Sequence, residues 1–339
     1  MSKYLELVEG VFAQEHLAKQ QNQKPYVAYS IKDGKVIYSI VPKEPNYLCL
    51  EPIDSNNQLA VVKTISTANT QYSFDKETWN EFPIDPSDPS NPAFVTVDRP
   101  IYLKGNNPNG YLNGESLEGS KIIGVGKYNV SGDITTLLNE EGNVTDLSDC
   151  SAGCFSMLFG EVKDIKEYPD LYIPAIDIVD ASKLILPSTT LVTACYANMF
   201  AGCTSLTVAP KLPATTLSYM CYMNMFMDCT SLVDAPELRA TELVDGCYGN
   251  MFYRCTSLTA APVLPATTLV TACYANMFGS CTNLNYIKCL SKHVLANATR
   301  SWVDGVSSTG VFVKHPDMTS WATGVNGIPS GWTIEDAVL

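Results

Sequence analysis

Residues 212–237 read LPATTLSYMCYMNMFMDCTSLVDAPE. This stretch is one of four similar, consecutive repeats. The copies occupy residues 186–211, 212–237, 238–263 and 264–289, so each is 26 residues long. Residues 189–200 recur letter for letter as residues 267–278. Repeats of a fixed length in the twenties are typical of solenoids, in which each repeat forms one coil and packs on its neighbours. The sequence therefore predicts a stack of four 26-residue coils.

Each coil contains one segment that is expected to be a short strand. Leu206, Ala209 and Leu212 are spaced so that their apolar side chains point to one side, and the strand is expected to end at Pro213. The same spacing recurs in the following two coils. We expect these residues to face the core and the stacked strands to lie about 4.8 Å apart.

A second segment of each coil is expected to be a short helical turn. Thr215 or Thr216 can cap this turn, because a threonine hydroxyl accepts a hydrogen bond from a free amide at a helix start. Four residue types then form an apolar stripe toward the core, and an asparagine is expected to bond backbone groups between coils. In the second coil the stripe and the asparagine are Cys221, Tyr222, Met225, Phe226 and Asn224.

The strand positions between the core residues vary from coil to coil, and we expect them to face solvent on one side of the stack. Variation on one face is expected when coils are copied for architecture and diversified for binding. Drift on an unconstrained surface would give the same pattern. The candidate ligand-binding face consists of Thr207, Val208, Lys211, Val233, Asp234, Glu237, Thr259, Ala260, Val263, Asn285 and Tyr286.

The flanking residues complete the expected architecture, which is α+β with a repeat solenoid. Residues 154–159 and 178–184 resemble parts of a coil, so the solenoid is expected to span residues 147–290 with a degenerate first coil, followed by a C-terminal cap over residues 291–339. Residues 46–146 contain β-rich runs broken by Pro, Asn and Gly, which predict a small β-sandwich-like domain. Residues 1–45 are expected to hold a helix over residues 4–20 and a β-hairpin centred on Asp33-Gly34.

Charge and hydropathy restrict the partners. The 339 residues include 22 Lys and Arg against 35 Asp and Glu, a net charge of −13, which argues against nucleic acid and anionic membranes because both require a basic surface. No stretch reaches the ~18 continuous apolar residues of a membrane span, so no membrane insertion is expected. The first fifteen residues contain Glu6, Glu9 and Glu15 and no apolar run, unlike a secretory signal peptide. Either the chain is made without a leader or a leader was removed.

No motif for catalysis, metal binding or a cofactor is found in the sequence, so a non-enzyme without catalytic residues, metal ligands or cofactors is expected. The three histidines, His16, His293 and His315, are isolated, which leaves little scope for general acid–base chemistry. There is no C-x2-C pair of the kind that zinc sites use. Residues 124–128 do not match a phosphate-binding loop, because its first glycine and its Ser or Thr are missing.

The twelve cysteines occur mainly in two columns with a 26-residue period. We expect the repeat cysteines to be buried, reduced thiols that pack as small hydrophobic side chains. Lateral disulfides between stacked coils are the alternative. Cys150 and Cys154, which lie outside the regular repeats, are the best candidates for an exception.

The unit C-Y-x-N-M-F-x-x-C-T-S-L-x-x-A-P-x-L-P is similar to the BspA-type leucine-rich repeats of Bacteroides-group surface proteins. The family's usual unit is A-F-x-x-C-x-x-L-x-x-I-x-L-P, and its places are filled here by Met199-Phe200, Cys203, Leu206, Ala209 (for the usual Ile) and Leu212-Pro213. The motifs Y-S-F-D-K-E-T-W and G-I-P-S-G-W-T resemble segments that flank such repeats. The resemblance covers about residues 45–339 and implies a right-handed leucine-rich-repeat solenoid.

The same resemblance implies a function. It suggests a non-enzymatic adhesion or recognition protein, at the cell surface or outside the cell, that binds a host or bacterial surface protein or a glycan through the strand face. Residues 24–38, KPYVAYSIKDGKVIY, are weakly similar to phage or prophage tail-associated proteins that carry the same repeats. The alternative is therefore a tail accessory protein of a phage particle that serves host attachment.

Overall fold

The computed structural model describes residues 26–32, 35–41, 45–63, 69–83, 93–110, 112–113, 118–161, 175–295, 297–318 and 321–338. The chain divides into two compact units, residues 1–46 and 47–339. In the first unit, β1 (Tyr26–Lys32) pairs antiparallel with β2 (Lys35–Val41), and the pair Lys32 with Lys35 leaves two residues between the strands. The predicted hairpin is thereby confirmed. The helix predicted for residues 4–20 lies outside the described residues.

The second unit begins with two β-sheets. The larger sheet has the strand order β12-β11-β3-β8-β5-β6 and the smaller one β7-β4-β10-β9. Both sheets contribute side chains to one hydrophobic core, such as Leu50 and Leu103 from the first and Leu59 and Ile122 from the second. The strands are β3 (Leu48–Pro52), β4 (Asn57–Lys63), β5 (Thr70–Ser73), β6 (Asn80–Glu81), β7 (Val95–Val97), β8 (Ile101–Gly105), β9 (Leu112–Asn113), β10 (Glu118–Val125), β11 (Lys127–Asp133) and β12 (Asp177–Ile185), with a 3-10 turn η1 (Ile134–Leu137) after β11.

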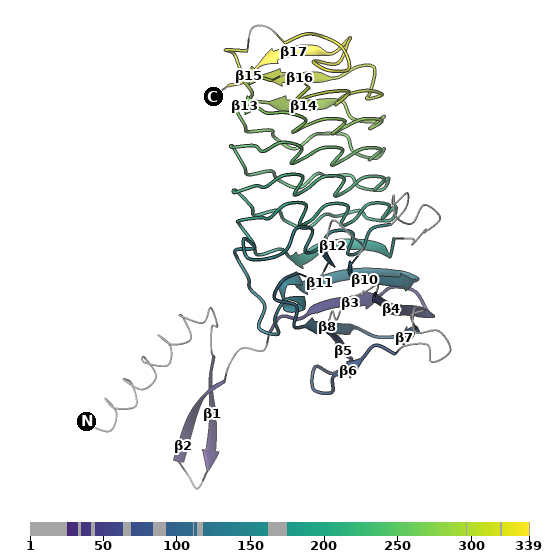
Figure 1. Cartoon of the computed structure of the whole chain (residues 1–339), viewed down its shortest axis with the longest axis vertical. Helices are drawn as coiled ribbons and strands as arrows, with labels where there is room; N and C mark the ends of the chain where they lie inside the picture. Colours follow the sequence, from purple (N-terminus) through teal and green to yellow (C-terminus); the bar gives the residue numbers. More distant parts are fainter. Residues whose placement is uncertain are drawn as a thin grey trace, which may run out of the picture. The chain divides into compact units, whose positions relative to one another are not determined.

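The larger sheet leads directly into the coils (Figure 1). Strand β11 pairs antiparallel with β3 on one side and parallel with β12 on the other. Asp180 of β12 then forms a parallel bridge to Val208 of the next coil. The β-rich segment and the coils therefore share one continuous core, which runs from Leu48 to Trp332.

Successive coils are joined by backbone hydrogen bonds along one segment of each coil. Every second amide donates to the carbonyl 25 residues later, as from Tyr222 N to Cys247 O at 3.0 Å and from Phe226 N to Met251 O at 2.9 Å. The amides between them close tight turns within the coil, as from Met225 N to Tyr222 O at 3.2 Å. Each coil is thus bonded to the next by a regular row of amides, and the coils form a parallel stack (Figure 1).

This segment is not the helical turn that the sequence predicts, so that prediction is wrong. Met220, Asn224 and Asp228 have φ values of 54°, 57° and 60°, in the left-handed region that an α-helix of L-residues cannot accommodate. A positive φ at the third residue of a four-residue turn is typical of a type II turn. An α-helix also uses its amides within itself, whereas here every second amide is taken by the neighbouring coil.

The predicted strand is also wrong for three of the four coils. At this place the coils at residues 186–263 have only isolated parallel bridges, at Val208, Asp234 and Ala260, and at Leu264 where the third of these segments ends. In the fourth coil β14 (Tyr286–Cys289) is a strand, and it pairs parallel with β16 (Val311–Lys314). Two residues beyond the bridge the first three coils carry Pro210, Pro236 and Pro262, where β14 has Lys288 and β12 has Ser182. Proline has no N–H to donate to a ladder, which explains why only the coils without it form strands.

The side chains that point inward form vertical columns. The predicted inward stripe is confirmed, because Cys221, Tyr222, Met225 and Phe226 are each at most 1% exposed. Phe226 stacks on the phenylalanines of both neighbouring coils, with ring centroids 5.6 and 5.7 Å away. The asparagine column differs from the expectation: Asn224 Nδ2 donates to the side-chain oxygen of Asn198 at 2.9 Å, so this amide bonds another amide and not the backbone.

The stack continues beyond the four predicted coils at both ends. The degenerate first coil is bonded as expected, with Phe155 N donating to Cys195 O at 2.9 Å. Within the predicted cap, Phe278 N donates to Trp302 O at 2.9 Å, and the Trp302 ring lies 6.2 Å from the rings of both Tyr274 and Phe278. One tryptophan thus covers two columns of smaller rings. Strand β16 pairs with β17 (Thr333–Asp336), and β13 (Thr268–Leu269) pairs with β15 (His293–Val294), in both cases parallel.

Asn224 should be needed both for its backbone conformation and for its side-chain amide. Asn224→Ala puts alanine at a φ of 57°, a left-handed conformation that costs alanine about 1–2 kcal/mol, and it also removes the hydrogen bond between the side-chain amides of residues 224 and 198. We therefore expect the free energy of unfolding to fall by about 2 kcal/mol. Asn224→Gly removes the same amide but relieves the backbone, so it should be the more stable of the two by about 0.5–1 kcal/mol. Urea denaturation measures both. Equal stability of the two variants would contradict the left-handed assignment.

Candidate binding face

All eleven residues of the candidate face are exposed. Parallel bridges join Val208 to Asp234, Asp234 to Ala260 and Ala260 to Tyr286, so one residue of each coil lies directly beside its counterpart. The residues just before these form a second row, and a third row follows three residues later with Lys211, Glu237 and Val263. The structure therefore brings the sequence-predicted residues together on one side of the coils. We call this surface the strand face.

The strand face carries several exposed large apolar side chains. Among the described residues, thirteen large hydrophobic side chains are exposed, and four of them, Val208, Val233, Val263 and Tyr286, belong to the candidate face. Ile185 of β12, at the end of the face, is a fifth. Single exposed apolar residues need no explanation, but a contiguous group is characteristic of an interaction surface.

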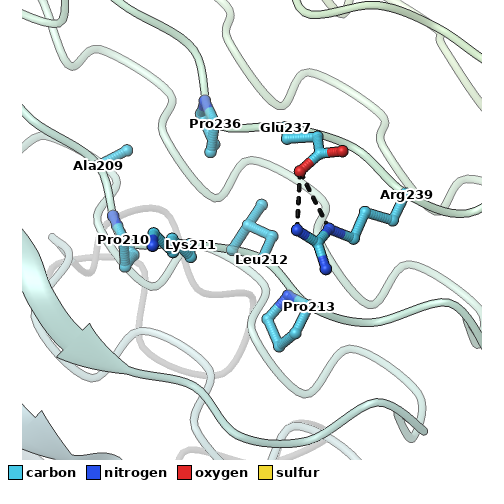
Figure 2. A pocket seen from close by; sticks show the side chains of 8 residues that line it. All are labelled: Ala209, Pro210, Lys211, Leu212, Pro213, Pro236, Glu237 and Arg239. Atoms are coloured by element: carbon cyan, nitrogen blue, oxygen red, sulfur yellow. Dashed lines mark hydrogen bonds and ion pairs between the residues drawn. The ribbon is translucent and has the colours of Figure 1, made fainter.

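A groove runs along one edge of the strand face. A depression of about 440 Å³ is lined by residues 209–211 of the first regular coil, by Leu212, Pro213, Pro236 and Glu237 of the second, and by Arg239 of the third (Figure 2). A second depression of about 380 Å³ lies beside it and shares Lys211 and Pro213. The second one is lined further by Lys183, Ile185 and other residues of 182–187. Prolines of the first two regular coils form part of the walls, so the backbone there is rigid before any ligand arrives.

The groove is basic although the chain is acidic. Residues 184–290 contain four basic side chains, and two of them, Lys211 and Arg239, line the groove together with Lys183. Arg239 donates two hydrogen bonds to Glu237 Oε2, at 3.0 Å from Nε and 2.9 Å from Nη2 (Figure 2). This pair is exposed and therefore contributes little to stability, which leaves both groups able to exchange partners.

Sequence reasoning found only part of this groove. Lys211 and Glu237 were in the candidate face, but Lys183, Ile185 and Arg239 were not, although all three line or border the same depressions. The signal that could have found them is the pair of proline columns. Pro210, Pro213 and Pro236 line the first depression and Pro187 and Pro213 line the second, so the residues near these prolines are candidates for the groove.

The cysteines of the coils lie in the core. Eleven of the twelve are buried, Cys150 is half-buried, and all twelve are free thiols. The predicted burial of the repeat cysteines is confirmed. Burial raises the pKa of Cys221 and of Cys281 to about 12, so both thiols resist ionisation and behave as small apolar side chains.

Lys121 is the one strongly perturbed cation among the described residues, and it lies at the junction of the β-rich segment and the first coil. It belongs to β10, is 4% exposed, and its Nζ donates to Met157 O at 3.0 Å and to Gly160 O. Burial lowers its pKa from 10.5 to about 7, opposed by Cys203 and Glu161. Because Lys121 reaches carbonyls of the first coil and no exposed surface, we interpret it as a structural link and not as part of a binding site.

Within the described part of the chain, no group of three or more His, Cys, Asp and Glu side chains is arranged to hold a metal ion. The described residues also contain no helix with the length and apolar character needed to span a membrane. Comparisons of this chain with protein-family models, with curated proteins and with solved structures find no significant match. The case for a function therefore depends on the strand face and its groove.

The buried position of Lys121 predicts a pH dependence of stability. Since its pKa is about 7 in the folded chain and 10.5 when unperturbed, unfolding takes up a proton between these pH values. The free energy of unfolding should therefore gain a contribution that rises above pH 7, with a slope approaching about 1.4 kcal/mol per pH unit.

Lys121→Met removes this contribution while keeping a chain of similar length. The difference in unfolding free energy between wild type and Lys121→Met, measured in urea at pH 6.5, 7.5 and 8.5, should shift in favour of wild type as the pH rises. Taking the difference cancels the opposing ionisation of the buried thiols. A difference that stays constant with pH would contradict the buried-cation assignment.

Proposed function

We propose that the coil stack is a leucine-rich-repeat solenoid of the BspA type and that the chain is a non-enzymatic recognition protein. It binds a protein or a glycan of a host or bacterial surface through the strand face, at the cell surface or outside the cell. The observation that carries this proposal is the concentration of exposed apolar side chains beside a basic groove on one side of the stack.

Two properties of the face support binding. The first is chemical: exposed apolar side chains such as Val208 and Val233 share the strand face with Lys211, a combination that matches the apolar centre and charged rim of protein interfaces. The second is mechanical. Backbone bonds from coil to coil hold the rows in register, so the face needs little ordering when a ligand binds.

The ligand is to be identified first. Purified chain should be applied to arrays of glycans and of host and bacterial surface proteins, and hits should be confirmed in solution. The proposal expects at least one reproducible hit with a dissociation constant in the micromolar range or tighter. Absence of any hit on both arrays would count against a recognition function.

Substitutions on the face then test where the ligand binds. Lys211→Glu and Val233→Asp should each weaken binding about thirtyfold or more, which corresponds to the ~2 kcal/mol of a hot-spot contact. Asp245→Lys and Tyr219→Asp are the matched controls. Both lie in the turn segment, by which we mean the part of each coil that contains the left-handed residues such as Met220 and Asn224. Tyr219 is 47% exposed, as is Val233.

The controls should change affinity by less than about threefold, because an exposed charge remote from the interface acts mainly on long-range steering. Titration calorimetry measures all four variants, and thermal melting checks that each is folded. Equal losses in the face variants and the controls, or a loss in the controls alone, would place the binding site elsewhere.

A further inference from the structure

Cys150 and Cys154 differ from the other ten cysteines in their position. They lie at the entrance to the coil stack, where Cys150 is half-buried and Cys154 is fully buried. Cys150 N donates to Leu147 O at 2.8 Å, and Gly153, with a φ of 72°, turns the chain between the two cysteines. Cys154 is the first member of the cysteine column that continues with Cys195. A half-buried thiol thus lies four residues before the start of the buried column.

The two thiols lie close enough to affect each other's ionisation. The Cys154 thiol lowers the pKa of Cys150, against the opposing effects of burial and of Asp149 and Asp146. The same contact raises the pKa of Cys154 further above its ordinary value. Cys150 Sγ also donates to Pro108 O at 3.8 Å. The most accessible thiol of the chain is therefore also the one whose pKa a neighbouring thiol lowers.

We propose that Cys150 and Cys154 form a redox-sensitive dithiol that reacts with low-molecular-weight disulfides and closes to an intramolecular disulfide. The proposal is independent of what the strand face binds. The half-buried Cys150 is the attacking group and the buried Cys154 is the resolving group.

The reaction has two exchange steps. The Cys150 thiolate attacks one sulfur of the disulfide RSSR, the S–S bond breaks, and the first RS⁻ leaves and takes up a proton from water. Cys154 then attacks Cys150 Sγ in the mixed disulfide, and its proton passes to the second RS⁻ as that group leaves. Two protein thiols are oxidised, one RSSR is reduced to two RSH, and no other oxidant is required.

The surroundings predict which disulfides react fastest. Asp146 and Asp149 lie close enough to Cys150 to affect its ionisation, and both are negatively charged at neutral pH. An anionic disulfide is repelled by this pair and a cationic one is attracted. Cystamine should therefore react faster than glutathione disulfide at low ionic strength, and added salt should reduce the difference.

The test uses the folded full-length chain, first reduced and freed of reductant, then treated with cystamine or glutathione disulfide at pH 7.5. Remaining thiols are counted with a chromogenic reagent after denaturation in acid-quenched samples, and disulfides are mapped by mass spectrometry of peptides. We expect a loss of two thiols, from twelve to ten, with the bond mapped to Cys150 and Cys154. The reaction with cystamine should be at least about fivefold faster.

Three variants separate this proposal from general thiol oxidation. Cys150→Ser should retain its eleven thiols over the same period, and Cys154→Ala should stop at a stable mixed disulfide on Cys150. Cys49→Ser is the matched control, because Cys49 is 8% exposed and burial raises its pKa to about 11, so its removal should leave the rate unchanged.

Circular dichroism establishes that each variant is folded. If Cys154→Ala does not fold, wild type and Cys150→Ser alone decide the question. The proposal is overturned if wild type keeps all twelve thiols, if the disulfide maps to other cysteines, or if Cys150→Ser loses thiols as fast as wild type.

Discussion

The architecture depends on how each coil uses its backbone amides. In the turn segment, alternate amides bond the next coil and the others close turns within their own coil, so all of them have partners without a helix or a conventional strand. This division requires a left-handed residue at every fourth position, at Met220, Asn224 and Asp228 in the second coil. Once a coil adopts this conformation, its carbonyls point at the preceding coil, and each coil becomes a template for its neighbour.

The columns of identical side chains follow from that template. Because the backbone repeats with the coil, the same residue type lies above itself, and large rings such as Tyr222 and Phe226 stack on their counterparts. Identical side chains have identical volumes, so a core of this kind is filled without the alternation of large and small residues that most cores use. The exposed positions are outside this constraint. They can change from coil to coil at little cost, which is the property a recognition face needs.

The 26-residue period, the inward stripe and the exposed face could be predicted because they depend on the spacing of apolar residues, which is visible in one chain. The turn segment could not, because the i and i+4 spacing of Cys221 and Met225 fits a helix equally well. The absence of continuous strand pairing in the first three regular coils could have been anticipated from Pro210 and Pro236. The coil in the predicted cap was missed because Trp302 replaces both Tyr274 and Phe278 and breaks the repeat. Arg239 of the groove was missed because it occupies a position that is proline in the other three regular coils.

The central claim is that one 26-residue coil is a complete structural unit whose amides and side chains fit those of any other regular coil. Deletion of residues 238–263 tests it directly, since Tyr222 would then meet Tyr274 and its amide would meet Cys273 O. Deletion of residues 238–250 is the control, because it removes half a coil and places every later column out of register. Thermal melting and amide hydrogen exchange should show a cooperatively folded chain after the 26-residue deletion and loss of the folded coil stack after the 13-residue one. A 26-residue deletion that is as unfolded as the control would contradict the account.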